Sequence, residues 1–254
     1  MRGCLPPIVA TAALLALAGP LAAQTGGAPA TDPSRKFEII DNSFLVEESF
    51  NQEPGVVQNI FTWTRSRRRD WQAVFTQEWP APGMTHQFSY TIPFSRSGPS
   101  AGINDVLLNY RYQLLTEAPG RPAMSPRLSL VVPTGREADG LGDGAVGLQV
   151  NVPASKQFGN LYLHGNAGGT WLHGGNWTTQ LAASGIVRVA PMFNLMLESV
   201  AVPGESITVS PGFRRGWNFG ERQLVIGAAV PAMRADGRTK VALLTYFSYE
   251  LPFR

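Results

Sequence analysis

Apolar and polar side chains alternate along short stretches of the chain from residue 56 to the C-terminus. In the last stretch Val241, Leu243 and Phe247 occupy odd positions, whereas Lys240 and Glu250 occupy even positions. Because successive side chains of a β-strand point to opposite faces, this period of two predicts a strand with one apolar and one polar face. Similar stretches, separated by turn-forming residues, predict about twelve strands, at residues 56–64, 71–79, 85–94, 103–115, 126–133, 144–153, 159–171, 178–189, 192–202, 205–214, 222–231 and 240–252.

Two architectures explain strands of this kind. A soluble sandwich packs the apolar faces into a core, whereas a transmembrane barrel turns them to lipid and encloses the polar faces in a lumen. Only 15% of the residues are charged, against about 25% in a soluble domain, and several stretches are long enough to cross a membrane when tilted. Aromatic residues also fall at the predicted strand ends, as interfacial girdles require: Trp63, Trp71, Trp79, Phe94, Tyr112, Trp171, Trp177, Phe193, Phe213, Trp217 and Phe253.

These observations predict an all-β fold, a transmembrane antiparallel β-barrel of about twelve strands. Closing the sheet also removes the edge strands that an open sheet of this length would expose. An even number of strands places both ends of the barrel in the periplasm, so the expected location is the outer membrane of a Gram-negative bacterium. The net charge is only +3 without a concentrated basic stripe, and no nucleic acid is expected as a partner.

The first residues predict a secretory signal peptide. An unbroken run of apolar or small residues at 8–18 follows Arg2, and Leu21-Ala22-Ala23 offers a cleavage site. We therefore divide the chain into a signal peptide (1–23), a flexible N-terminal segment (24–54) and the barrel (55–254). Cleavage would remove Cys4, the only cysteine, so no disulfide and no cysteine-ligated metal is expected.

The C-terminus carries a second targeting pattern. Phe247, Tyr249, Leu251 and Phe253 alternate up to the end of the chain. This pattern resembles the terminal-strand signal that the outer-membrane barrel-assembly machinery reads, which makes that machinery an expected partner. The signal normally ends on the aromatic residue itself, and here Arg254 follows it.

Several short motifs, taken in order, carry a resemblance to a known family. They are residues 41–48 (DNSFLVEE), 51–58 (NQEPGVVQ), 102–106 (GINDV), 126–135 (PRLSLVVPTG), 142–144 (GDG), 147–151 (GLQVN) and 164–168 (HGNAG). From about residue 40 to the C-terminus, the chain resembles the meta-pathway phenol-degradation family of proteobacterial outer-membrane proteins. The resemblance implies an outer-membrane barrel that transports hydrophobic or aromatic compounds, and it supplies no established catalytic residues.

The polar faces of the predicted strands define a candidate lumen lining. Charges on these strands should face inward, because an arginine or lysine in lipid at the bilayer midplane costs roughly 2–4 kcal/mol. The mixed signs would either line a wet pore or pair into a network that blocks it. The predicted lining residues are Glu78, Asp105, Asn109, Arg111, Arg127, Gln149, Asn151, His164, Asn166, Arg188, Glu198, Arg214, Lys240 and Glu250.

Candidates for catalysis and for cofactor binding are few. His86 shares a predicted apolar face with Phe88, and His173 lies in a turn, whereas His164 falls on the lumenal face of its strand. A serine–histidine pair would suffice for acyl transfer, but the sequence contains no G-x-S-x-G motif and pairs no serine with His164. The acidic stretch 137–143 lacks the spacing of a calcium loop. We therefore predict no catalytic residue, no metal and no cofactor.

On this basis the sequence predicts an outer-membrane channel or transport protein for small, hydrophobic or aromatic solutes. Two alternatives stay open from the sequence. One is a barrel enzyme that modifies lipids and uses His164, and the other is a structural or adhesive barrel.

Four arginines occupy the predicted first hairpin. Arg65, Arg67, Arg68 and Arg69 would lie outside the cell, beside outer-membrane lipid and the phosphates of lipopolysaccharide. Guanidinium groups bind phosphate well through paired hydrogen bonds. We expect this loop to contact lipopolysaccharide, with an ordinary solvated loop as the alternative.

An acidic and apolar stretch, residues 37–52, precedes the first predicted strand. Its members Asp41, Asn42, Phe44, Glu47 and Glu48 are the candidate residues of a plug that folds back into the periplasmic mouth of the barrel. In this hypothesis the carboxylates pair with lumenal arginines such as Arg127 or Arg188. The alternative is a periplasmic tail or an extension of the first strand.

Overall fold

The computed structural model describes residues 38, 39, 41–66, 70–81 and 83–253. The predicted signal peptide and Arg67, Arg68 and Arg69 of the first hairpin lie outside the described residues. Within the described residues, no helix has the length and apolar character needed to span a bilayer.

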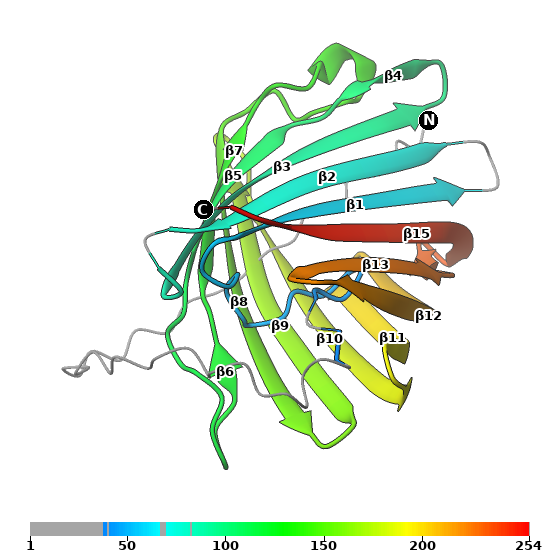
Figure 1. Ribbon diagram of the computed structural model, residues 1–254. Helices are drawn as coiled ribbons and strands as arrows, with labels where there is room; N and C mark the ends of the chain where they lie inside the picture. The colour runs from blue at the N-terminus through cyan, green and yellow to red at the C-terminus, as the bar shows by residue number, and fades with distance from the viewer. Residues whose placement is uncertain (1–37, 40, 67–69, 82, 254) are drawn as a thin grey trace.

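The chain forms one closed antiparallel β-barrel (Figure 1). Its strands are β1 (Val56–Ser66), β2 (Trp71–Pro80), β3 (His86–Ser97), β4 (Ser100–Ile103), β5 (Val106–Tyr112), β6 (Ala123–Met124), β7 (Arg127–Val132), β8 (Gly147–Phe158), β9 (Leu161–Leu172), β10 (Trp177–Ala190), β11 (Phe193–Val202), β12 (Ser206–Phe219), β13 (Arg222–Ala229), β14 (Ala232–Ala235) and β15 (Arg238–Pro252). A short 3₁₀ helix, η2 (Glu137–Asp139), lies between β7 and β8.

The wall consists of twelve strands in the order β1-β2-β3-β5-β7-β8-β9-β10-β11-β12-β13-β15, and β1 pairs with β15 to close it. The short strands add to this wall, because β4 pairs with β3, β6 pairs with β8, and β14 pairs with both β12 and β15. The predicted all-β transmembrane barrel of about twelve strands is therefore confirmed. We call the end of the barrel where β1 begins and β15 ends the terminal end, and the opposite end the loop end.

Two of the predicted strands are interrupted or shortened in the structure. The stretch 103–115 contains the last residue of β4 and the strand β5, and Asp105 lies in the connection between them. The stretch 222–231 ends early as β13, and β14 continues its register beyond Val230 and Pro231. The reason is that proline has no backbone N–H to donate to the ladder. The ladder continues around it, since Val230 N donates to the Pro211 carbonyl over 3.0 Å and Ala242 N donates to the Pro231 carbonyl over 3.0 Å.

The outer surface is apolar and the inner surface is polar. Along β8, Leu148 and Phe158 point outward and are 42% and 57% exposed, whereas Gln149, Asn151 and Ser155 point inward and are buried. A soluble protein shows the reverse arrangement, with exposed polar and buried apolar faces. The wall therefore presents an apolar band to its surroundings, as a barrel in lipid does.

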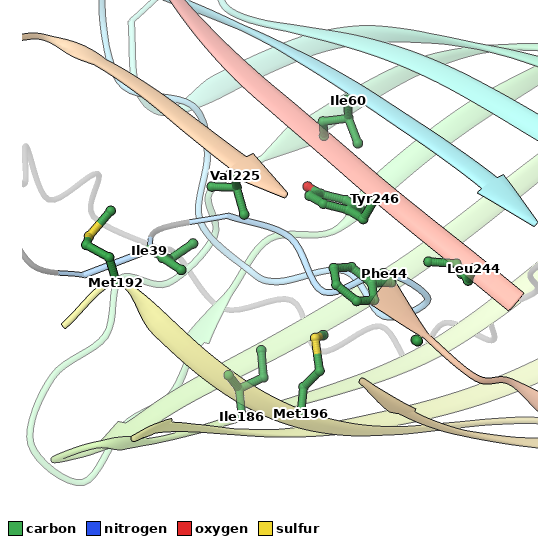
Figure 2. Packing of buried hydrophobic residues seen from close by; sticks show 10 residues of the cluster. Ile39, Phe44, Ile60, Ile186, Met192, Met196, Val225, Leu244 and Tyr246 are labelled. Carbon is green, nitrogen blue, oxygen red and sulfur yellow. The ribbon is translucent and has the colours of Figure 1, made fainter. Parts of the chain in front are cut away.

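The hydrophobic core lies inside the barrel rather than between two sheets (Figure 2). Ile39 and Phe44, which precede β1, pack against inward-facing side chains of the wall. The Phe44 ring stacks on Tyr246 of β15, with ring centroids 4.7 Å apart. The other core members are Ile60, Ile186, Met192, Met196, Val225, Ala229 and Leu244.

We predict that Gly227→Ala loosens this core without preventing barrel assembly. A methyl group on Gly227 of β13 would overlap the Phe44 ring, and overpacking of this kind typically costs about 1–3 kcal/mol. Limited proteolysis should cut the chain near Phe44 faster, while the difference in gel mobility between boiled and unboiled protein should persist. Gly165→Ala is the matched control, because a methyl group there meets no atom within 4 Å. Equal cleavage rates in the two variants would contradict the prediction.

Candidate functional site in the barrel lumen

A segment of chain without regular secondary structure lies inside the barrel. We call residues 38, 39 and 41–52 the lumenal segment; in Figure 1 it is the blue coil enclosed by the strands. The strands that hydrogen-bond to it are β1, β3, β5, β7, β8, β9, β10, β11, β12, β13 and β15. The segment is therefore held by nearly the whole circumference of the wall.

The lumenal segment enters and leaves at the terminal end. Glu38 contacts Arg188 near the end of β10, and Gln52 N donates to Oε1 of Gln87 near the start of β3 over 2.6 Å. Between these points the chain reaches mid-strand positions, where Ser43 hydrogen-bonds to Ser184 over 2.9 Å. The segment thus fills the terminal half of the lumen as a loop.

Two ion pairs join the lumenal segment to the wall. Arg127 Nη2 lies 2.6 Å from Glu47 Oε1, and its Nε donates to Glu47 Oε2 over 3.1 Å. Arg188 Nη1 lies 2.6 Å from Glu38 Oε1. The structure thus brings a carboxylate of the segment to each of the two arginines that the plug hypothesis names. The contact of Arg127 with Glu47 has the paired geometry that makes arginine–carboxylate contacts strong and directional.

Two further arginines bind the backbone of the segment. Arg111 donates to the carbonyl oxygens of Glu48 (3.2 Å) and Phe50 (2.6 Å) and to Asn51 Oδ1 (3.0 Å). Arg214 Nη1 donates to the carbonyl oxygens of Asp41 (2.7 Å) and Asn42 (2.8 Å). A guanidinium group has five donors in one plane, so it can satisfy several carbonyls that have no strand partner.

Acceptors on the wall satisfy the N–H groups of the segment. Glu198 Oε1 accepts from the backbone N–H groups of Leu45 (2.8 Å) and Val46 (3.2 Å). The side chain of Asn166 accepts from Glu47 N over 2.9 Å and donates to the Glu47 carbonyl over 2.8 Å. Buried backbone groups must find partners, and here wall side chains take the place of a neighbouring strand.

The remaining predicted plug residues also lie inside the barrel. Asp41 Oδ1 accepts from Gln58 Nε2 and from the Tyr246 hydroxyl, each over 2.6 Å. Asn42 Oδ1 accepts from Glu48 N over 3.3 Å, which closes the loop of the segment on itself. The Glu48 side chain is buried.

His164 pairs with a serine that the sequence could not identify. The β8–β9 register sets Ser155 opposite His164, and Ser155 Oγ lies 2.7 Å from His164 Nδ1. Ser155 Oγ also accepts from the backbone N–H and the hydroxyl of Ser49, over 2.8 and 2.9 Å. The lumenal segment therefore covers the serine–histidine pair.

Most of the predicted lining residues lie on the inward face of a wall strand. These are Glu78, Asn109, Arg111, Arg127, Gln149, Asn151, His164, Asn166, Arg188, Glu198, Arg214 and Glu250. Lys240 shares the inward side of β15 but is exposed at the loop end, beyond the packed lumen.

Asp105 differs from its predicted place in a strand. It lies in the β4–β5 connection, where its two oxygens accept from Gly135 N (2.9 Å) and Asp143 N (2.8 Å). It thereby anchors the long loop 133–146, whose Leu141 is buried, at the loop end of the barrel. Burial, together with the neighbouring carboxylates of Asp105 and Glu137, raises the pKa of Asp143 in this loop.

Sequence reasoning missed several residues that hold the lumenal segment. Gln87, Gln113 and Ser184 all bind it, and Tyr246 supports it from β15. The period of two places each of them on an inward face, which is the signal that could have found them. The predicted lining set does not include these four residues, because it takes mainly charged and amide side chains and draws them from only some of the strands.

A small cavity lies beside the lumenal segment. Its volume is about 40 Å³, enough for water but not for an organic solute. Gln180 Oε1 of its lining is buried and makes no hydrogen bond. The lining residues are Leu45, Glu47, Asn151, Asn166, Gly168, Gln180 and Ala182. Among the residues that the structure describes, no group of three or more histidines, cysteines or carboxylates is placed to hold a metal ion.

Comparison with known proteins places the fold among bacterial outer-membrane barrels. The chain is similar to an outer membrane channel from Pseudomonas putida, with a TM-score of 0.58, 12% sequence identity and coverage of 81% of this chain and 98% of that one. At this identity the likeness concerns the fold alone.

Two further solved structures have TM-scores too low to support an argument. A bacterial polysaccharide outer membrane secretin has a TM-score of 0.43 at 11% identity, covering 80% of this chain and 100% of that one. A structure described under asymmetric conductivity of engineered proteins has a TM-score of 0.30 at 8% identity, covering 77% and 99%. No protein-family model and no curated protein matches the chain. The fold defines a transmembrane β-barrel with an internal segment of its own chain.

We predict that Arg111→Ala exposes the lumenal segment. The change removes three donations to the segment, and a hydrogen bond to a charged group typically contributes about 1.5–3 kcal/mol. The only native cysteine is Cys4, so maleimide labelling of Ser49→Cys in a Cys4→Ala background reports how often the segment opens. Adding Arg111→Ala should speed the labelling at least about tenfold. Arg215→Ala, an arginine on the outer face of β12, is the control, and an equal effect of both changes would contradict the prediction.

We predict that Asp105→Ala frees the loop 133–146. The amides of Gly135 and Asp143 lose a charged acceptor, a contact worth about 1.5–3 kcal/mol. Their hydrogen exchange should therefore accelerate by about tenfold or more, measured by mass spectrometry. Asp139→Ala, which removes only the exposed pair with Arg136, should leave both amides unchanged.

Proposed function

We propose that this protein is an outer-membrane channel for small, hydrophobic or aromatic solutes, and that its lumenal segment is a plug. The observation that carries the proposal is the filling of a polar-lined barrel by a segment that contributes no strand to the wall. Eight-stranded barrels can be filled by side chains alone, and porins of 16–18 strands leave an aqueous channel. A wall of twelve strands lies between these sizes.

The way the segment is held favours a plug over a permanent core. It is bound mainly by side chains that reach from the wall, and no backbone ladder joins it to any strand. Removing it would leave the β-sheet hydrogen bonds of the wall intact. A purely structural or adhesive barrel has no need for this arrangement.

The lumen presents both apolar and polar side chains, and this supports the solute class. Strands β1, β10, β11, β13 and β15 present apolar side chains inward, among them Ile60, Ile186 and Leu244. Strands β3 to β9 present amides, hydroxyls and arginines, such as Asn109 and Gln149. A solute with an apolar ring and a polar group would match both kinds of side chain, and the Phe44 ring stacked on Tyr246 marks a place where an aromatic ring already fits.

The proposed orientation puts the terminal end in the periplasm. A barrel with an even strand number has both termini on one side, which is the periplasm in bacterial outer-membrane barrels. The barrel-assembly machinery would insert the chain, and the plug would be reached from the periplasm. The likeness to the Pseudomonas putida outer membrane channel agrees with this location.

The geometry favours the channel over a lipid-modifying enzyme. Ser155 and His164 are within hydrogen-bond distance, which is the first requirement for acyl transfer. Ser155, however, faces the lumen and is occupied by Ser49, so a membrane lipid has no path to its hydroxyl. The pair instead fixes the plug.

We predict that deleting residues 38–52 raises the single-channel conductance in planar bilayers several-fold, because the deletion empties the terminal half of the lumen. In liposome swelling, phenyl glucoside should then enter at least as fast as the smaller methyl glucoside, since the ring can contact the apolar side chains that Phe44 covers. Deletion of residues 24–37 is the matched control and should leave the conductance unchanged. If the 38–52 deletion variant folds but its conductance is unchanged, the proposal that the segment is a plug is wrong. If that variant passes neither ions nor solutes, the proposal that the barrel is a channel is wrong.

A further inference from the structure

Two arginines lie in one row across the outer surface at the loop end. The strand register sets Leu243 of β15 opposite Arg65 of β1, Arg65 opposite Trp71 of β2, and Trp71 opposite Arg96 of β3. Directly opposed residues of neighbouring strands share one face of a sheet, and Leu243, at 48% exposure, shows that this face is the outer one. Both arginines are exposed, and with two strand spacings between them their Cα atoms lie about 10 Å apart.

The next outward row, nearer the middle of the barrel, is apolar and aromatic. Trp63 of β1 lies opposite Ala73 of β2, which lies opposite Phe94 of β3. The Arg65 guanidinium carbon is 6.0 Å from the centre of a Trp63 ring. Arginines therefore stand directly above an aromatic row, as side chains do where a membrane meets water.

An open groove borders this row. It has a volume of about 280 Å³ and lies beside the break between β13 and β14. Val230, Val241 and Leu243 provide its apolar wall, and Arg65 is its one charged lining residue among those described. The groove lines up with the row, since Leu243 belongs to both.

The charged side chains that these strands turn outward at the loop end are arginines. The two carboxylates that β1, β2, β3 and β15 contain, Glu78 and Glu250, both face the lumen. One carboxylate lies nearby, Asp70 in the β1–β2 connection, and it accepts a hydrogen bond from Gly98 N over 3.1 Å. On the strands themselves an approaching anion meets no outward carboxylate.

We propose that this face is a binding site for an acylated, phosphorylated lipid of the outer leaflet. An acyl chain would lie in the Val230–Val241–Leu243 groove, and a phosphate would be held by Arg65 and Arg96 on either side of Trp71. A lipid fits better than free phosphate, because the arginines are joined to an apolar groove and an aromatic row. The inference rests on the outer-membrane location in the proposed function, and it concerns the opposite surface of the wall from the solute path.

The test measures lipid binding to the detergent-purified full chain by native mass spectrometry. The probes are a bis-phosphorylated, multiply acylated glucosamine disaccharide, its dephosphorylated form, and inorganic phosphate. Arg65→Gln/Arg96→Gln should weaken binding of the phosphorylated lipid at least about tenfold. The matched control, Arg215→Gln/Arg222→Gln, neutralises two outward arginines toward the terminal end and should change binding little.

A second variant tests the groove. Val241→Trp fills it and should weaken binding of both lipids while leaving the arginines in place. Boiled and unboiled gel mobility verifies that each variant is a folded barrel. Equal losses of lipid binding in the two arginine double variants would overturn the site. If the dephosphorylated lipid or phosphate alone binds as well as the phosphorylated lipid, the phosphorylated lipid is not the ligand of the site.

The two proposals fail separately. Plug deletion and conductance test the channel without reference to the arginine row. A protein that conducts as expected but binds no lipid at this face loses only the lipid site. If the protein binds the lipid at Arg65 and Arg96 but never conducts, only the channel proposal is wrong.

Discussion

The structure depends on buried polar groups inside the barrel finding partners. The lumenal segment has no strand to pair with, so its carbonyls and N–H groups turn to wall side chains, chiefly Arg111, Arg214, Glu198 and Asn166. An unpaired buried polar group costs about 1–3 kcal/mol. Without the segment, polar groups of the wall would lose hydrogen-bond partners, and the same holds for the segment without the wall. This mutual need sets the position of the segment and the polarity of the inward faces.

The same segment also supplies the interior with apolar contacts. A wall of twelve strands encloses more space than its own side chains fill, and Ile39 and Phe44 take up part of that space against β10, β11, β13 and β15. The segment is thus held both by apolar packing and by charged hydrogen bonds, and strands β10 and β11 contribute to both. Displacing it exposes an amphipathic lumen, which connects the packing of the barrel to the solute class proposed for it.

The outer surface is divided as clearly as the inner one. Most of it is an apolar band, but at the loop end of β15, β1, β2 and β3 the register places Arg65 and Arg96 on either side of Trp71. The interrupted strand at Val230–Pro231 adds a groove beside them. Proline, which removes a hydrogen-bond donor from the ladder, thereby shapes a surface feature as well as ending a strand.

The sequence by itself determined the strands and their faces, because a period of two survives wherever one face is apolar and the other polar. It therefore gave the barrel, its approximate strand number and the inward side of residues such as Arg111 and Glu198. The partners were decided by tertiary structure: Ser155 meets His164 only through the β8–β9 register, and Asp105 holds Gly135 and Asp143 because a loop folds back on it. The plug hypothesis named Arg127 and Arg188 from charge alone, but only the closed barrel, which brings residues 80 and 150 positions apart together, decides that Glu47 meets the first and Glu38 the second.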